Sequence, residues 1–113
     1  MILYHDQQDP SHPDYEVSKE VKATLEAAGD FELIAVPAPK VLRDEEGIVD
    51  YSYINHYIVN GAVILCSFDD PNDLVAKAIL EKVYPDREIV LVDARQIFAN
   101  GGGIHCITQQ QPA

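Results

Sequence analysis

The residues best suited to chemistry lie near the end of the sequence, where a glycine run leads into a cysteine. Cys106 follows the run Gly101-Gly102-Gly103 after two intervening residues. Three successive glycines cost backbone entropy and leave no side chain to pack, so they require a reason. One reason is that Gly102 and Gly103 let the backbone approach a ligand, with Cys106 presented beyond them on a strand-like segment as a nucleophile. The alternative is a flexible turn beside a small buried thiol.

Two further side chains could take part in such a site. His105 invites assignment as a general base beside Cys106. Neighbouring side chains of an extended strand point to opposite faces, so we expect His105 to point away from Cys106 and to be structural. Cys66 ends the apolar run 63–66, which predicts a buried structural thiol.

A polar loop near the start of the chain carries several side chains that bind metals in other proteins. They do not have the compact spacing of a metal site, so we expect a solvated acidic loop and no metal. The side chains in question are His5, Asp6, Asp9, His12 and Asp14.

The bulk properties restrict the partners. The chain has 19 acidic and 8 basic residues and a formal charge of -11, which argues against nucleic acid and anionic lipid. No apolar stretch approaches the ~20 residues of a membrane span. The first residues lack the basic and apolar regions of a signal peptide. With two cysteines forty residues apart, we expect reduced thiols and a cytoplasmic location.

The pattern of the second half predicts strand, hairpin, strand, helix and strand. Residues 52–59 are rich in Tyr, Ile and Val, which suits a strand. Asn60-Gly61 predicts a hairpin to a returning strand over 62–68. Asp70-Pro71 opens a helix, in which Leu74, Ala78, Ile79 and Val83 mark the apolar face. A buried strand over 88–92 and one helical turn over 93–98 complete the order.

The first half predicts the later part of a similar unit. Residues 2–4 suit a short strand, and Val17, Val21, Leu25 and Ala28 recur at helical spacing up to Gly29. A strand follows over 31–36, and residues 40–50 form an exposed loop. The predicted class is therefore α/β with a mixed sheet and an architectural repeat, residues 1–50 being a partial repeat and 51–113 a whole one.

Four segments resemble one protein family, in the family's order and spacing. The string Gly-Gly-Gly-Ile-His-Cys-Ile-Thr-Gln-Gln-Gln-Pro over 101–112 resembles the carboxyl-terminal signature of the agmatine deiminases. These belong to the peptidyl-arginine deiminase group of the guanidine-modifying, or pentein, superfamily. Residues 52–61, 68–73 and 84–90 are similar to the family segments that precede it, although His56 stands where the family has phenylalanine.

The resemblance implies a five-bladed α/β propeller, of which this chain is a carboxyl-terminal part. It implies a hydrolase of putrescine and polyamine biosynthesis that converts agmatine to N-carbamoylputrescine and ammonia without a metal or an organic cofactor. Cys106 matches the nucleophile, which forms a covalent amidino intermediate. Gly102, Gly103 and Asn55 are candidate substrate-binding residues, although Asn55 also suits a structural role at a strand edge.

The family's other catalytic groups are not found in the sequence. The acid/base histidine belongs to a His-hydrophobe-Asp motif that this chain lacks. A planar guanidinium also needs opposed carboxylates. We therefore expect an inactive isolated chain that forms a homo-oligomer or pairs with an upstream portion. The alternatives are a peptidyl-arginine deiminase-like fragment and a non-catalytic remnant or interaction module.

Overall fold

The computed structural model describes residues 1–113 and begins with a strand-helix-strand unit. Strand β1 (Ile2–Asp6) leads through a loop to helix α1 (Asp14–Ala28), and strand β2 (Leu33–Pro37) returns. β1 and β2 pair in parallel, as the helical crossover between them allows. Gly29 ends α1, which confirms the predicted stop.

The second half forms a complete strand-strand-helix-strand unit. Strand β5 (Tyr57–Val59) turns into β6 (Ala62–Ser67), and helix α2 (Asn72–Val83) carries the chain to β7 (Glu88–Asp93). The strand order is β5-β6-β7, antiparallel on one side of β6 and parallel on the other. This confirms the mixed sheet and the hairpin at Asn60-Gly61, where Val59 pairs with Ala62.

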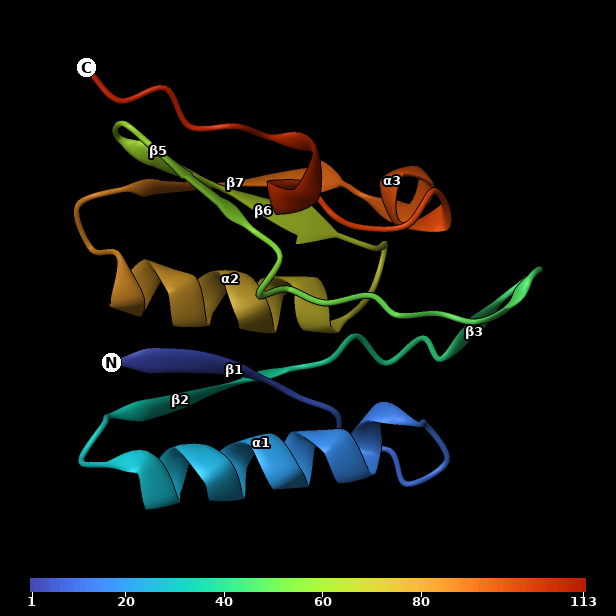
Figure 1. Ribbon diagram of the computed structural model, residues 1–113. Helices are drawn as coiled ribbons and strands as arrows, with labels where there is room; N and C mark the ends of the chain where they lie inside the picture. The colour runs from blue at the N-terminus through green and yellow to red at the C-terminus, as the bar shows by residue number, and fades with distance from the viewer.

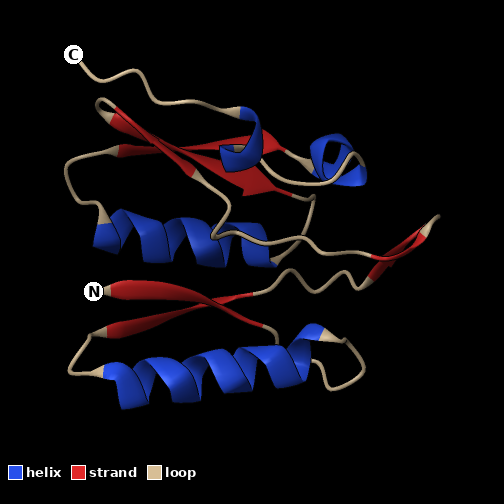
Figure 2. Ribbon diagram, viewed as in Figure 1, coloured by secondary structure: helices blue, strands red, loops and turns tan.

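The two units are stacked in layers (Figure 1). Helix α2 lies between the β1–β2 pair and the three-stranded sheet, with α1 at the outer end of the stack (Figure 2). The segment after α3 (Arg95–Ala99) crosses the face of the three-stranded sheet opposite α2 and contains the 3-10 helix η1 (His105–Ile107). One apolar core includes Val36 of β2 and Leu80 of α2. None of the helices has the length and hydropathy needed to span a membrane.

The buried face of α2 differs from the predicted one. Leu74 is 69% exposed and Ala78 is exposed, whereas Asp73, Ala76 and Leu80 are buried. The cause is Asp73, whose carboxylate accepts two backbone N–H groups and therefore fixes the rotation of the helix. Residues three and seven positions later share its face. The prediction of a helix is confirmed, and the assignment of Leu74 and Ala78 to its core face is wrong.

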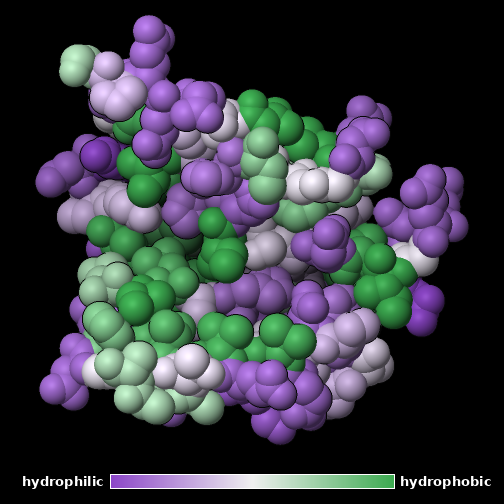
Figure 3. Space-filling model, viewed as in Figure 1, coloured by the Kyte–Doolittle hydropathy of each residue, from purple (hydrophilic) through white to green (hydrophobic).

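Helix α1 leaves part of its apolar face uncovered. Val17 is 52% and Val21 is 40% exposed, and Ser18 is its one buried residue. With Leu25, these side chains line a groove of about 290 Å³ beside β1 and Ile54. Figure 3 shows apolar surface gathered on this side of the molecule, over β1 and the adjoining part of α1. The spacing correctly predicts the helix, but this face is open.

The strand predicted over 52–59 is shorter than expected. Only Tyr57–Val59 is strand, and a turn precedes it. Tyr53 is fully buried there, and its carbonyl bonds to the ring of His56, 3.0 Å away. The half-buried His56 ring also lies edge-on to Tyr84. The predicted exposed loop over 40–50 contains a small hairpin of β3 (Arg43–Asp44) and β4 (Gly47–Ile48), followed by the buried Val49.

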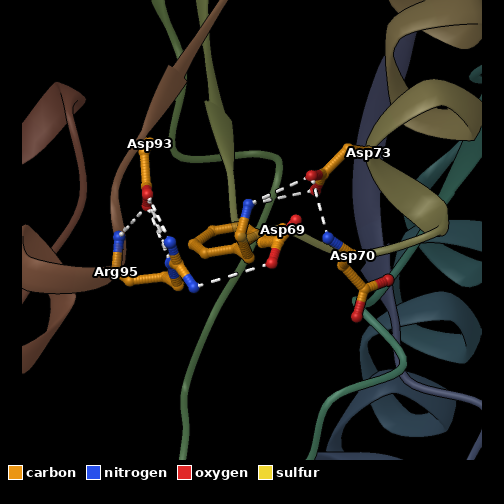
Figure 4. Close-up of polar contacts among 6 residues, drawn as sticks. Asp69, Asp70, Asp73, Asp93 and Arg95 are labelled. Atoms are coloured by element: carbon orange, nitrogen blue, oxygen red, sulfur yellow. Dashed lines mark hydrogen bonds and ion pairs between the residues drawn. The ribbon is translucent and has the colours of Figure 1, made fainter.

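The carboxylate of Asp73 joins this turn to the first turn of α2. It accepts the Tyr53 hydroxyl at 2.6 Å and the backbone N–H groups of Phe68 and Asp70 at 3.0–3.2 Å. Figure 4 shows the hydrogen bonds that both backbone N–H groups donate to Asp73, and beside them Arg95 paired to Asp93 and Asp69. Burial and Asp73 both raise the pKa of Tyr53, so its hydroxyl remains a donor. A buried carboxylate with this set of donors is satisfied.

The Tyr53–Asp73 bond should contribute measurably to stability. We expect Tyr53→Phe to lower the free energy of unfolding by about 1–2 kcal/mol, because Asp73 loses a buried donor. Tyr51→Phe is the matched control, since that ring stacks on Phe68 in the same cluster and its hydroxyl takes no part in the Asp73 network. Urea unfolding measures both variants. Equal losses would contradict this role of the bond.

Candidate functional site

Cys106 lies on a helical turn and not on a strand. The segment His105–Ile107 forms η1, in which the N–H of Ile107 bonds to the carbonyl of Ile104. Ile104 is buried in the core, whereas Cys106 is exposed. The strand prediction is wrong because the glycine run reverses the chain across the sheet face, and the buried Ile104 anchors the turn. The exposed thiol also excludes the reading of Cys106 as a buried hydrophobe.

Asn55 is the side chain that meets this turn. Its Nδ2 donates to Cys106 Sγ at 3.1 Å, and its Oδ1 accepts the backbone N–H of His105 at 2.9 Å. Its own carbonyl accepts the thiol of Cys66 at 3.0 Å. Asn55 therefore lies beside the nucleophile candidate from 51 residues away in the chain. The hydrogen bond to the His105 N–H agrees with the structural role suggested for Asn55, and its contact with a substrate stays a prediction.

Gly102 and Gly103 make room for the contact between Asn55 and Cys106. A Cβ on Gly103 would lie 2.6 Å from Asn55 Cγ and 2.7 Å from Phe98 Cε2. On Gly102 it would lie 2.9 Å from Cys106 Sγ, and the φ of +151° is also unfavourable for other residues. The predicted reason for the glycines, close backbone approach, applies here to protein side chains. Their contact with a substrate stays a prediction.

The surroundings of Cys106 favour the thiolate. The hydrogen bond from the Asn55 amide and the backbone N–H of Gly103 lower the pKa of Cys106. A thiolate is the nucleophilic form of cysteine. An adjoining hollow of about 450 Å³ has one carboxylate, on Asp50, which the sequence gave no motif to identify. The hollow is lined by Asp50, Ser52, Ile54, Asn55, Phe98, Gly102 and His105.

His105 and Cys66 differ in their surroundings. The His105 ring lies edge-on to Tyr57, with 6.3 Å between the ring centroids. The argument from a strand is wrong for His105, which is exposed and also lines the hollow beside Cys106, so its structural role stays a prediction. Cys66 is fully buried, and burial raises the pKa of its thiol. This confirms the prediction of a buried thiol at Cys66.

The amino-terminal loop is more ordered than the predicted solvated loop. His12 is buried, with its Nε2 2.8 Å from the carbonyl of Val49 and its Nδ1 accepting the N–H of Asp14. His5 lies 3.1 Å from the Ser52 hydroxyl. These contacts join the loop to the segment before β5 and to the start of α1.

The carboxylates of Asp6 and Asp9 in this loop accept local hydrogen bonds. Asp6 accepts one from the side chain of Gln8, and Asp9 accepts one from the hydroxyl of Ser11. No cluster of three or more metal-binding side chains is present.

The fold and the exposed thiol define the class as an α/β protein with an accessible cysteine beside a mixed sheet. The sequence model of the Porphyromonas-type peptidyl-arginine deiminases matches residues 1–112. The chain belongs to this family.

Curated relatives are longer than this chain. A Streptomyces avermitilis protein named "Putative agmatine deiminase" is 56% identical over 99% of this chain and 34% of its own length. The agmatine deiminase of Ectopseudomonas mendocina is 38% identical over 96% of this chain and 35% of its own length. The chain thus spans about a third of the curated relatives that it matches.

Solved structures share the fold. The Campylobacter structure titled "C. Jejuni Agmatine Deiminase" has a TM-score of 0.84 and 31% identity over 92% of this chain and 31% of its own. An agmatine deiminase of Enterococcus faecalis, titled as catalysing its reaction, has a TM-score of 0.87 and 26% identity over 97% of this chain and 36% of its own. The arrangement of both units is therefore that of known deiminases.

Gly103 should be intolerant of even one methyl group. We expect Gly103→Ala to cost about 1–3 kcal/mol of stability and to slow alkylation of Cys106, because the new methyl displaces Asn55 or Phe98. Gly101→Ala is the control, since its Cβ would meet nothing within 4 Å and only backbone strain at φ +100° is added. Urea unfolding and mass-spectrometric alkylation rates measure the two effects. Equal alkylation rates in both variants would contradict the packing argument.

Proposed function

We propose that this chain carries the nucleophile of an agmatine deiminase, with Cys106 as that residue. The observation that carries the proposal is the exposed thiol of Cys106, which receives the Asn55 amide at 3.1 Å in a fold shared with agmatine deiminases. A related structure supports it: the cysteine-to-serine form of the C. jejuni enzyme is titled as having substrate bound.

The proposed reaction needs only the thiolate and water as nucleophiles. Cys106 Sγ attacks the guanidinium carbon of agmatine, the bond from that carbon to a terminal nitrogen breaks, and the acid/base group of the complete enzyme gives a proton to the leaving ammonia. The product of this step is an amidino-thioether on Cys106. Water then attacks the same carbon and gives one proton back to the acid/base group. The carbon–sulfur bond breaks to return the thiolate, and the second proton of the water leaves on ammonia as ammonium. The products are N-carbamoylputrescine and ammonia.

The isolated chain should bind and turn over agmatine poorly. A guanidinium presents five donors in one plane and needs acceptors on more than one side. The hollow beside Cys106 offers one carboxylate, Asp50, and the His105 ring is packed against Tyr57. We propose that further carboxylates and the acid/base group come from a portion outside these 113 residues.

Agmatine and peptidyl-arginine remain distinct proposals for the substrate. The matching family model is named for peptidyl-arginine deiminases, whereas the relatives reported above are named agmatine deiminases. We favour agmatine on the strength of these named relatives. A remnant without catalysis would instead retain the fold and show no adduct in the experiment below.

A completed enzyme should form its covalent intermediate on Cys106. The part of the S. avermitilis relative that this chain does not match, joined to this chain, supplies the missing portion. We expect this chimera to release ammonia from agmatine and the isolated chain to release little, because acid/base catalysis alone contributes ~100-fold or more. Rapid quenching and mass spectrometry should locate the amidino adduct on the peptide that contains Cys106.

Control variants of the chimera separate a loss of chemistry from a loss of folding. Cys106→Ala in the chimera should abolish turnover while agmatine binding, measured by calorimetry, persists. Adduct on Cys66, or wild-type turnover by Cys106→Ala, would overturn the assignment. Turnover of an arginine peptide in preference to agmatine would favour the other substrate.

We further propose that β1 accepts another strand, as one blade of a propeller would require. In the second unit β5 pairs antiparallel with β6, whereas the corresponding edge of β1 has no partner. The groove lined by Leu3, Val17, Val21 and Ile54 lies beside that edge. An unpaired edge next to apolar surface favours strand addition. In the isolated chain the available partner is a second copy.

The isolated chain should therefore associate. We expect light scattering to show a dimer or a larger species. Val21→Lys should shift the equilibrium between this species and the monomer toward the monomer, because the substitution places a charge in the groove. Leu74→Lys is the control, since Leu74 is 69% exposed on α2 and does not line this groove. A wild-type monomer across a wide concentration range would contradict association through β1.

A further inference from the structure

The orientation of the Asn55 side-chain amide follows from its backbone partner. The N–H of His105 can only donate, so the atom that it meets at 2.9 Å must be the amide oxygen. The NH2 group of the same amide then faces Cys106 Sγ at 3.1 Å. The sulfur therefore meets a donor, and the alternative flip would leave two donors opposed at His105.

The position of Asn55 is as constrained as its orientation. The Asn55 side chain lies where a Cβ on Gly103 would be 2.6 Å from its Cγ, so it occupies the space that the glycine leaves. Its backbone carbonyl accepts a hydrogen bond from the buried Cys66 thiol. Two residues earlier, Tyr53 is fully buried and bonded to Asp73. The amide is thus held at the sulfur by fixed structure on both sides.

We propose that Asn55 is a second residue of the catalytic site, whose amide N–H holds Cys106 as a thiolate and fixes the direction of its sulfur. The inference rests on the proposed role of Cys106 as the nucleophile. A hydrogen bond to the charged form of a group favours that form. An amide also has no charge to titrate, so this stabilisation persists across the pH range in which the enzyme works.

Other titratable groups near the sulfur do not supply this effect. The carboxylate of Asp50, in the adjoining hollow, opposes a negative sulfur. The Cys66 thiol is buried with a raised pKa, and the His105 ring lies against Tyr57. Gly103 adds a backbone N–H to the amide of Asn55, and both lower the pKa of Cys106. Of these two donors, only the Asn55 amide belongs to a side chain and can be removed by substitution.

The test measures the ionisation of Cys106 in the full 113-residue chain, without substrate. The rate of iodoacetamide alkylation is followed against pH, and mass spectrometry quantifies the Cys106 peptide separately from that of Cys66. Asn55→Asp is nearly isosteric and keeps an oxygen for the His105 N–H, but it presents an acceptor to the sulfur. The midpoint is the pH at which the alkylation rate of Cys106 reaches half of its maximum. We expect the midpoint of Asn55→Asp to lie about one pH unit or more above that of the wild type, with alkylation near pH 7 about tenfold slower.

Three further measurements make the result decisive. Asn55→Ala should raise the midpoint less than Asn55→Asp, because it removes the donor without adding a charge. His105→Gln keeps the backbone N–H and should leave the midpoint nearly unchanged. The wild-type chain in urea gives the midpoint of an unfolded Cys106, and the folded value should lie below it.

The proposal is overturned if the folded and unfolded midpoints of the wild type agree, or if folded Asn55→Asp titrates like the wild type. A larger shift in His105→Gln than in Asn55→Asp would assign the effect to the imidazole. Because no turnover is measured, these outcomes are independent of whether the chimera hydrolyses agmatine. A failure of the chimera with a normal Asn55 effect would contradict the proposed function alone.

Discussion

The buried carboxylate of Asp73 is the constraint on which the rest of the site depends. It receives the Tyr53 hydroxyl and two backbone N–H groups, and a buried charge without such donors would be costly. These bonds fix the rotation of α2 and hold the turn before β5 against its first residues. That turn carries Asn55 to Cys106. The geometry of the thiol thus depends on a hydrogen-bond network in the core.

The two units are joined at the same end of α2. Asp70 accepts the backbone N–H groups of Lys40 and Val41, and Asn72 donates to the carbonyl of Ala38. The helix therefore belongs to the second unit by sequence and is covered by the first. One edge of β1, in the first unit, remains without a paired strand. The proposed completion of the enzyme and the proposed association of the isolated chain both involve that edge.

The residues around Cys106 have different proposed roles, which are physically compatible with one another. Gly102 and Gly103 leave the space that Asn55 and the thiol occupy, and Asn55 supplies a neutral donor. A guanidinium substrate would add positive charge beside the sulfur and would favour the thiolate further. The single carboxylate of the hollow leaves substrate recognition to other groups. Preparation of the nucleophile and binding of the substrate are thus separable properties in the proposed enzyme.

Local patterns in the sequence determined most of the elements, including both long helices, the turn at Asn60-Gly61 and the strand before α3. Helical spacing and turn chemistry are encoded within a few residues, so they can be read directly. The glycine run also drew attention to Cys106, whose thiol is exposed in the structure and whose role as the nucleophile stays a prediction. Only the tertiary structure decided that Leu74 faces solvent and that Asn55 meets a cysteine 51 residues away. Such contacts depend on how distant segments pack, which no local pattern records.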